Sequence, residues 1–375
     1  MSESRLALLP RPAIQATAPS HHGAFDYDEL ERLGLKPEDV LDFSVNSNPH
    51  GPTPLVREAL ARVRLDVYPD REALALRRAL AAALDVSPQA IVVGNGVSEL
   101  IMLVVLAYAQ PGRRVLIVGP TYSEYRRAAS LMDLAVEEWR CEAASDFVAD
   151  VEAILARCAP PHLAFLCNPN NPTGAYLPLD AVSRLVDAWP GTLWVIDEAY
   201  LPFVPGARSV LELKRETVLV LRSMTKDYAL AGLRLGYAVG NEATVAPLAR
   251  VRPPWNVNAL AQAAGLAALA DGEHLARSMG LLQTDRQHLV NSLRTIGLRV
   301  YPSATHFFLV ETGDGAATRR ALLRQGVLVR DCASFDLPAF VRIATRKRDE
   351  NLALIAALAP STNSQRAASN AHRRY

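Results

Sequence analysis

A chain of 375 residues, half of them hydrophobic, is long enough for two domains or for one large domain with an appendage. Its 40 Lys and Arg residues nearly balance its 39 Asp and Glu residues, so bulk charge does not favour nucleic acid or an anionic membrane as a partner. The four cysteines have no CxxC spacing and the eight histidines form no ligand pattern. We therefore expect reduced thiols, a cytoplasmic protein and no metal site.

Both ends of the chain have the composition of appendages. Residues 1–25 contain several prolines and are expected to form an extended arm, since the apolar run Leu6–Leu9 is too short for a signal peptide. The polar residues after Pro360 predict a disordered tail. The longest apolar run, Leu100–Ala109, has half the length that a bilayer span needs.

The middle of the chain alternates apolar strands with helices, which is typical of a parallel sheet with helices on both faces. It follows predicted helices at Asp26–Leu33, Pro54–Val63 and Arg71–Leu84 and a short predicted strand at Val40–Asn46. The alternating strands are Ile91–Val93, Val115–Val118, Leu163–Cys167, Leu193–Ile196 and Val218–Leu221, and the helices are Leu100–Ala109, Glu124–Met132 and Leu179–Ala188.

The pattern changes near residues 246–254 to one typical of an α+β domain. Helices are predicted at Leu260–Ala270, Leu275–Leu293 and Thr318–Gln325, and strands at Arg299–Tyr301, Phe307–Val310, Val327–Arg330 and Phe340–Ile343. We expect a large α/β domain over residues 46–250 and a smaller α+β domain over residues 251–360. The N-terminal arm, residues 1–45, is expected to belong to the small domain, and residues 361–375 to form the tail.

Lys226 lies just past the buried strand Val218–Leu221, where open α/β sheets place their chemistry. Its amine can form a Schiff base with an aldehyde. The hydroxyls of Ser223 and Thr225 and the guanidinium of Arg234 are near it in sequence and suit a phosphorylated aldehyde. Taken alone, a lysine in a loop is more often a solvated surface residue.

Polar or aromatic residues follow four other predicted strands. Gly94–Glu99 can bind an anion at a helix N-terminus, where Gly96 lets the backbone approach the anion. Alternatively, Ser98 is an ordinary N-cap residue of the following helix. Asn168–Gly174 is a rigid loop that can aim an amide over the sheet edge, or a plain turn. Asp197 can pair with a protonated pyridine nitrogen or cap a helix. Tyr122 can stack on a flat cofactor or pack in the core.

The coincidence of these features favours the functional interpretation over the ordinary one at each position. An aldehyde-trapping lysine, an acid, an aromatic ring, an amide and an anion site at five strand ends together predict a pyridoxal-phosphate site. The motifs NPNNPTG, DEAY and SMTK…GLRLGY occur in this order. The chain thereby resembles the fold-type-I pyridoxal-phosphate enzymes of aminotransferase class I/II, from about His22 to Ala359. The branch that it resembles most contains histidinol-phosphate aminotransferases and threonine-phosphate decarboxylases.

The resemblance implies a role for each motif residue. Lys226 would hold the cofactor covalently and move the proton, Asp197 would pair with the pyridine nitrogen, and Tyr122 would stack on the ring. Asn171 and Tyr200 would bond the phenolic oxygen. The cofactor phosphate would be held at Gly96, Val97, Ser98, Ser223, Thr225 and Arg234. Tyr68 would reach the neighbouring subunit's site, which implies a homodimer with shared active sites, and Arg330 and Arg342 would bind substrate.

The branch leaves two activities open for a small phosphorylated amino substrate. His22 and Asn46 match residues that grip the substrate phosphate in the decarboxylases, so decarboxylation of threonine phosphate, for the cobalamin side chain, is the activity that the sequence favours. Ala24, where the decarboxylases usually have a second glycine, and Ala229–Gly232 are more similar to the transaminases. The alternative is therefore transamination of histidinol phosphate with 2-oxoglutarate. A ligand-binding module with this fold and no catalysis is a third interpretation.

Overall fold

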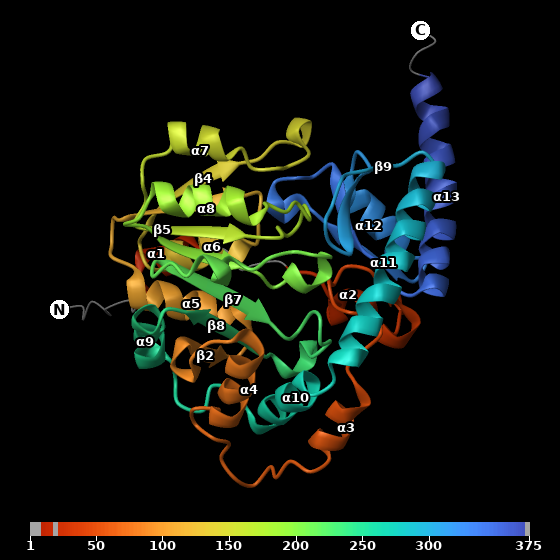
Figure 1. The fold of residues 1–375 in the computed structure, drawn as a ribbon. Coiled ribbons are helices and arrows are strands. Elements are labelled where there is room, and N and C mark those ends of the chain that lie inside the picture. Colours follow the sequence, from red (N-terminus) through yellow and green to blue (C-terminus); the bar gives the residue numbers. More distant parts are fainter. Residues whose placement is uncertain (1–8, 18–21, 372–375) are drawn as a thin grey trace, which may run out of the picture.

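A seven-stranded sheet forms the centre of the larger part of the molecule (Figure 1). The computed structural model describes residues 9–17 and 22–371, with residues 360–371 as backbone only. The strands of the sheet lie in the order β2 (Ile91–Gly94), β8 (Gly236–Gly240), β7 (Val218–Ser223), β6 (Leu193–Asp197), β5 (Leu163–Cys167), β3 (Arg114–Gly119) and β4 (Ala135–Arg140). Of these strands, β8 alone runs in the direction opposite to the other six. The carboxyl ends of the other six therefore meet at one edge.

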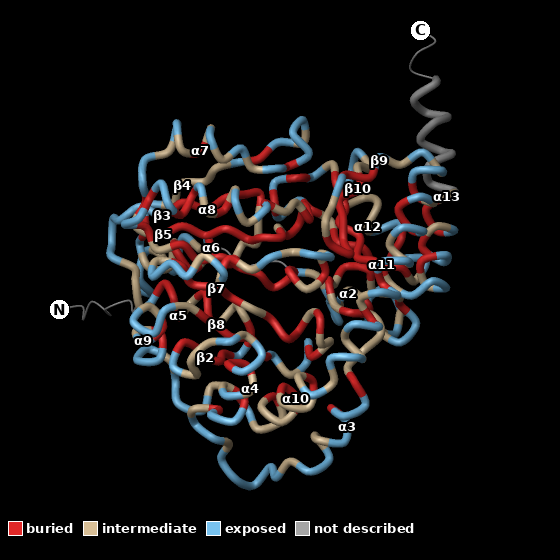
Figure 2. Tube along the Cα trace, viewed as in Figure 1, coloured by how far each residue is buried: buried red, intermediate tan, exposed pale blue. Residues whose placement is uncertain are grey.

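Helices cover both faces of this sheet, so its inner strands are buried on both sides (Figure 2). One face packs against α4 (Leu74–Leu84), α7 (Val151–Arg157), α8 (Leu179–Ala188) and α10 (Ala259–Leu269). The other face packs against α5 (Val97–Tyr108), α6 (Ser123–Leu131) and α9 (Glu242–Val251). A strand buried in this way must be apolar throughout, which is why runs of Val, Leu and Ile predicted these strands correctly.

A smaller antiparallel sheet lies beside the large one. Its strands are β12 (Arg330–Asp331), β13 (Phe340–Ala344), β10 (Phe307–Glu311) and β9 (Arg299–Val300), in that order. Its core includes side chains of α11 (Gly272–Thr295), α12 (Gly315–Leu323) and α13 (Arg348–Ala371). The N-terminal segment joins this part, because β1 (Leu41–Asp42) pairs with β11 (Val327–Leu328) and Leu30 of α2 (Tyr27–Leu33) packs on Leu323. The predicted fold class, a mostly parallel α/β sheet with a smaller α+β part, is confirmed.

The structure differs from the sequence expectations in several elements. The strands β4 and β8 and the helix α7 were not expected: β4 is a partly exposed edge strand with charged residues, and β8 begins and ends with glycine. α10 packs on the large sheet and on α3 (Pro54–Leu60), although the sequence placed it beyond the domain boundary.

The ends of the chain differ as well. The predicted strand Val40–Asn46 pairs over only two residues. The expected extended arm contains a short helix, α1 (Pro12–Ala16), while residues 1–8 and 18–21 of the arm lie outside the described residues. The predicted disordered tail, 361–375, overlaps the end of α13. The last four residues of that tail, 372–375, lie outside the described residues. Within the described residues, no helix has the length and apolar character of a membrane span.

Candidate active site

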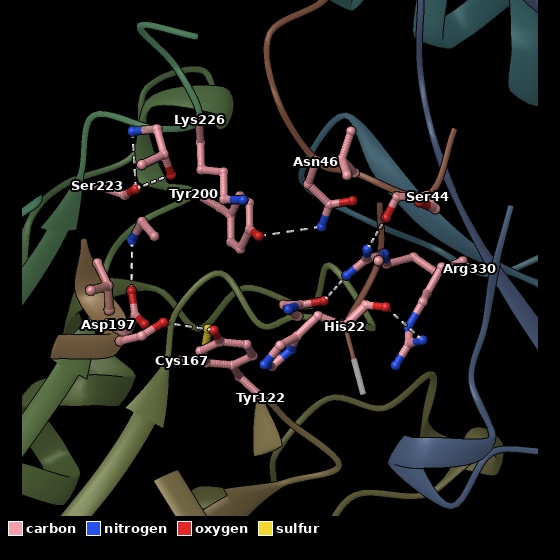
Figure 3. A pocket seen from close by; sticks show the side chains of 18 of the residues that line it. His22, Ser44, Asn46, Tyr122, Cys167, Asp197, Tyr200, Ser223, Lys226 and Arg330 are labelled. Carbon is pink, nitrogen blue, oxygen red and sulfur yellow. Dashed lines mark hydrogen bonds between the residues drawn. The ribbon is translucent and has the colours of Figure 1, made fainter. Parts of the chain in front are cut away.

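A cavity of about 840 Å³, counting its open mouth, lies at the carboxyl edge of the large sheet (Figure 3). Its lining combines residues that follow β2, β3, β5, β6 and β7 with residues of the smaller part of the molecule. Of the residues singled out from the sequence, the following line it: His22, Asn46, Val97, Ser98, Tyr122, Asn171, Asp197, Tyr200, Ser223, Thr225, Lys226, Arg234, Arg330 and Arg342. The strand ends converge because parallel strands share one edge.

Lys226 follows β7 and extends its amine into the cavity (Figure 3). The side chain keeps some exposure to solvent because it faces this open space, although protein atoms surround it on its other sides. Burial within the protein lowers the pKa of Lys226 to about 8, and the positive charges of Arg342 and Arg234 act in the same direction. A neutral amine is the form that attacks an aldehyde, so this environment favours a nucleophilic lysine.

Asp197 ends β6 and is almost fully buried. Its Oδ1 accepts a hydrogen bond of 2.9 Å from the backbone N–H of Ala199, and its Oδ2 accepts one of 2.7 Å from the hydroxyl of Tyr125. Burial raises the pKa of Asp197, and these two hydrogen bonds oppose the rise. The carboxylate is thus held at both oxygens and needs a cationic partner to offset its burial.

An anion site lies at the N-terminus of α5, where Val97 and Ser98 begin the helix. Gly96 precedes them with φ of 81°, and a Cβ at this position would lie 2.8 Å from Nη2 of Arg234. The hydroxyls of Ser223 and Thr225 are 2.7 Å apart at the end of β7. Backbone N–H groups, hydroxyls and a guanidinium around one point are the donors that a phosphate requires.

Two neutral donors face the cavity from the other side. The amide oxygen of Asn171 accepts a hydrogen bond from Nη1 of Arg342, so its NH₂ group remains for the cavity. The hydroxyl of Tyr200 accepts a bond of 3.4 Å from Nδ2 of Asn46, so its own proton also remains. The second Arg342 nitrogen, Nη2, donates to the backbone oxygen of Ser44. Both groups that accept these hydrogen bonds from Arg342 are uncharged, so its buried positive charge remains available to an anionic ligand.

His22 and Arg330 lie near each other among the residues that line the cavity (Figure 3). Nη1 of Arg330 donates to the backbone oxygen of His22 at 3.2 Å, and Nη2 donates to Oγ of Ser334 at 2.5 Å. Nε2 of His22 lies 3.1 Å from Oε1 of Glu124, and its ring is 5.5 Å from that of Tyr122 between centroids. The backbone of His22 is thereby joined to Arg330, and its ring is held by Glu124.

Tyr68 and Gly96 do not line this cavity. Gly96 acts through the backbone turn described above. Tyr68 is 80% exposed and its ring lies 4.8 Å from that of Trp255, away from the cavity of its own chain. Sequence reasoning did not single out Tyr125, Cys167, Ser44 or Phe335, which also line the cavity. Tyr125 could have been found from its position in the first turn of the helix that follows Tyr122.

The residues present fit the cofactor that the resemblance implies. A carboxylate, a lysine and a phosphate-binding turn surround one cavity, with Ser98 and Tyr122 joined by a hydrogen bond of 3.0 Å beside that turn. Among the described side chains, Oδ1 of Asn46 and Nε of Arg342 are buried polar atoms without a hydrogen-bond partner. Such atoms cost free energy unless a ligand reaches them. The donor set thus suits a molecule with a phosphate, a ring nitrogen and further anionic oxygens.

Comparisons with known proteins agree with this arrangement. The sequence pattern of the family described as aminotransferase class I and II matches residues 38–358. Similar relatives include a histidinol-phosphate aminotransferase of Anaeromyxobacter sp. (strain Fw109-5), 39% identical over 88% of this chain and 93% of the relative. Another histidinol-phosphate aminotransferase, of Moorella thermoacetica, is 36% identical over 95% of this chain and 94% of the relative.

Two solved structures are similar to most of the chain. The histidinol-phosphate aminotransferase of Sinorhizobium meliloti, in complex with pyridoxal-5'-phosphate, has a TM-score of 0.85 at 28% identity and covers 97% of this chain and 99% of its own. The L-threonine-O-3-phosphate decarboxylase of Porphyromonas gingivalis has a TM-score of 0.75 at 28% identity, covering 84% of this chain and 97% of its own.

Proposed function

Because the chain belongs to the aminotransferase class I and II family, we propose that it transfers the amino group of histidinol phosphate to 2-oxoglutarate. The family confirms the expectation of a pyridoxal-phosphate-dependent enzyme. The sequence alone favours decarboxylation, but the relatives at 36–39% identity support the alternative, transamination. The observation that carries the proposal is one cavity with Lys226 and Asp197 at the sheet edge and two buried arginines on the opposite wall.

The chain's own residues divide the work of holding the cofactor. Bound pyridoxal phosphate supplies an electron sink, which needs a cationic ring nitrogen. Asp197 would pair with that nitrogen, and Lys226 would hold the cofactor and move a proton at the substrate's Cα. Asn171 and Tyr200 would donate to the phenolic oxygen, because Arg342 and Asn46 already occupy their acceptor sites. The anion site at the start of α5 would hold the phosphate, and Tyr122 would stack on the ring.

Arg330 and Arg342 explain why a phosphorylated substrate fits. Both guanidinium groups are buried, with 7% and 5% of each residue exposed. Each charge therefore lies in a poorly solvated place, and this burial lowers the pKa of both arginines. A dianionic phosphate offsets this cost through charge-assisted hydrogen bonds. In the second half-reaction, the carboxylates of 2-oxoglutarate meet the same need at the same arginines.

Decarboxylation of threonine phosphate is the second candidate, and a specific observation favours it. His22 and Asn46, which match the phosphate-gripping residues of the decarboxylases, both line the cavity together with the arginines. The structure of the Porphyromonas gingivalis decarboxylase is also similar to this chain. Bound pyridoxal phosphate would supply the electron sink for either reaction, and which bond at Cα breaks would depend on which substrate group the arginines hold.

A direct assay separates the two activities. Purified enzyme loaded with pyridoxal phosphate should convert histidinol phosphate only when 2-oxoglutarate is present, with glutamate as the second product. The same enzyme should release no CO₂ from threonine phosphate. Release of CO₂ from threonine phosphate without any keto acid, together with no glutamate from histidinol phosphate, would reverse the assignment in favour of the decarboxylase.

The same proposal includes a homodimer with shared sites. The segment after α3 carries several exposed apolar side chains, among them Leu65 and Tyr68, each 80% exposed, and Trp255 packs beside Tyr68. Exposed apolar groups of this size are typical of a surface that another protein covers. In a two-fold dimer, Tyr68 would leave its own subunit and approach the partner's cavity.

A further inference from the structure

The helix after β3 brings a second tyrosine to the cavity. Tyr125 of α6 is fully buried, and its hydroxyl donates the hydrogen bond of 2.7 Å to Oδ2 of Asp197. Its ring stacks on Phe165 of β5, with 5.0 Å between centroids, and meets the ring of Tyr122 edge-on at 5.7 Å. Packing on two sides leaves the ring one orientation, so its hydroxyl remains directed at Asp197.

The protonation of this pair is set by its surroundings. Burial raises the pKa of Tyr125 well above its usual value, and the nearby Asp197 charge adds to the rise, so the phenol keeps its proton. Burial raises the pKa of Asp197 as well, and the bond from Tyr125 is the foremost contact that lowers it again. A donor directed at a carboxylate stabilises the charged form of that carboxylate.

We propose that Tyr125 is a positioning residue that keeps Asp197 ionised and turned towards the cavity, where the carboxylate faces the ring nitrogen of the cofactor. The inference rests on the proposed function, since it takes that nitrogen to belong to pyridoxal phosphate. Tyr125 holds one carboxylate oxygen and the backbone of Ala199 holds the other. The acid is thereby oriented before a ligand binds, which reduces the free-energy cost of binding.

The change Tyr125→Phe tests the hydroxyl while leaving the stacked ring in place. The dissociation constant of pyridoxal phosphate, measured by equilibrium dialysis of the holoenzyme, should rise roughly ten- to a hundredfold, as for a lost hydrogen bond to a charged group. The pH at which the visible absorption of the bound cofactor changes should also shift, because Asp197 ionises less readily. Tyr108→Phe is the matched control, since its hydroxyl donates at 2.7 Å to the backbone of Thr244 outside the cavity.

A double-mutant cycle with Asp197→Asn separates positioning from a purely structural role. In the Asn background, Tyr125→Phe should change the cofactor dissociation constant by about twofold or less, because no charge is left to stabilise. An equal loss in both backgrounds would overturn the proposal, and so would Tyr125→Phe with unchanged affinity and an unchanged absorption profile. A wild-type protein that binds no pyridoxal phosphate would refute the proposed function itself. If the wild type binds the cofactor and the Tyr125→Phe variant binds it equally well, only the role of Tyr125 is refuted.

Discussion

A lysine in a loop usually extends into water, whereas Lys226 extends into a cavity between Arg342 and Arg234. Burial and these two charges lower its pKa to about 8, so a large fraction of the amine is neutral at mildly alkaline pH. Arg234 lies eight residues after Lys226 in the same motif, whereas Arg342 comes from β13, 116 residues away. The reactivity therefore depends on the fold as well as on the motif.

This environment predicts where and how fast the cofactor attaches. After pyridoxal phosphate is added to cofactor-free protein and the bond is reduced with borohydride, peptide mapping should find the pyridoxyl group on Lys226. The rate of attachment should rise as pH passes about 8, because the neutral amine increases there, whereas an ordinary lysine would need a pH near its usual value of about 10.4.

The chain's other lysines, Lys36, Lys214 and Lys347, are internal controls for this labelling. They should stay unlabelled at stoichiometric cofactor, and Lys226→Ala should abolish the reduced adduct. A pyridoxyl group on one of the three, or an attachment rate that does not change between pH 7 and 9, would contradict the assignment.

At the scale of elements, the turn between β2 and α5 decides how the anion site is built. Glu99 in the first turn of α5 accepts a hydrogen bond of 2.6 Å from the backbone of Asn95 and another of 2.6 Å from Asn256. These bonds fix the turn, while the left-handed conformation of Gly96 brings the backbone close to Arg234. The N-terminus of the helix and the guanidinium thus reach the same anion.

The change Gly96→Ala should disturb this site through a single atom. The new Cβ would lie 2.8 Å from Nη2 of Arg234 and displace the guanidinium. We expect the dissociation constant of pyridoxal phosphate to rise by roughly tenfold or more, as for a weakened charged hydrogen bond. Equilibrium dialysis of the variant against the cofactor measures this change.

Gly112→Ala provides the matched control, because Gly112 has a similar φ of 76° and nothing within 4 Å of the added Cβ. Both variants should lose free energy of unfolding, on the order of 1–3 kcal/mol, because alanine is strained at a positive φ. Only Gly96→Ala should lose cofactor affinity. Equal cofactor affinities in the two variants would show that Arg234 does not contribute to the anion site.

At the scale of the whole molecule, the cavity exists only because distant segments come together. Asn46 precedes the large sheet, Arg330 and Arg342 lie in β12 and β13 of the small sheet, and Lys226 follows β7. The pairing of β1 with β11 holds the N-terminal segment beside the small sheet and so carries His22 and Asn46 to the arginines. Tyr68 is not among the residues that line the cavity of its own chain, and in the proposed dimer it would reach the partner's cavity.

Mixed dimers test that contribution. Tyr68→Phe should weaken cofactor or substrate binding while the melting temperature stays that of the wild type, because its exposed ring supports no core. Mixing it with an inactive Lys226→Ala chain should restore activity, since each hybrid dimer has one site with an intact lysine and an intact tyrosine. Random exchange at equal amounts should recover about a quarter of wild-type activity. Proven subunit exchange without recovery would count against shared sites.

The sequence by itself determined five of the seven strands of the large sheet, all except β4 and β8, and the side chains that follow those five. Buried strands are apolar runs, and the polar residue after each run, such as Asp197 or Lys226, is visible without any structure. Because the carboxyl ends of parallel strands meet at one edge, the sequence also predicted that these residues form one site. The family resemblance added the cofactor, which the comparisons confirm.

Only the tertiary structure decided how those residues are held. The bonds from Tyr125 to Asp197 and from Arg342 to Asn171 join residues 72 and 171 positions apart, which no local pattern specifies. Tyr125 resembles a core residue of an amphipathic helix, and β8 resembles a turn because glycine begins and ends it. The physical reason is that periodicity records which face of an element is buried, whereas the partner on that face depends on how the whole chain closes.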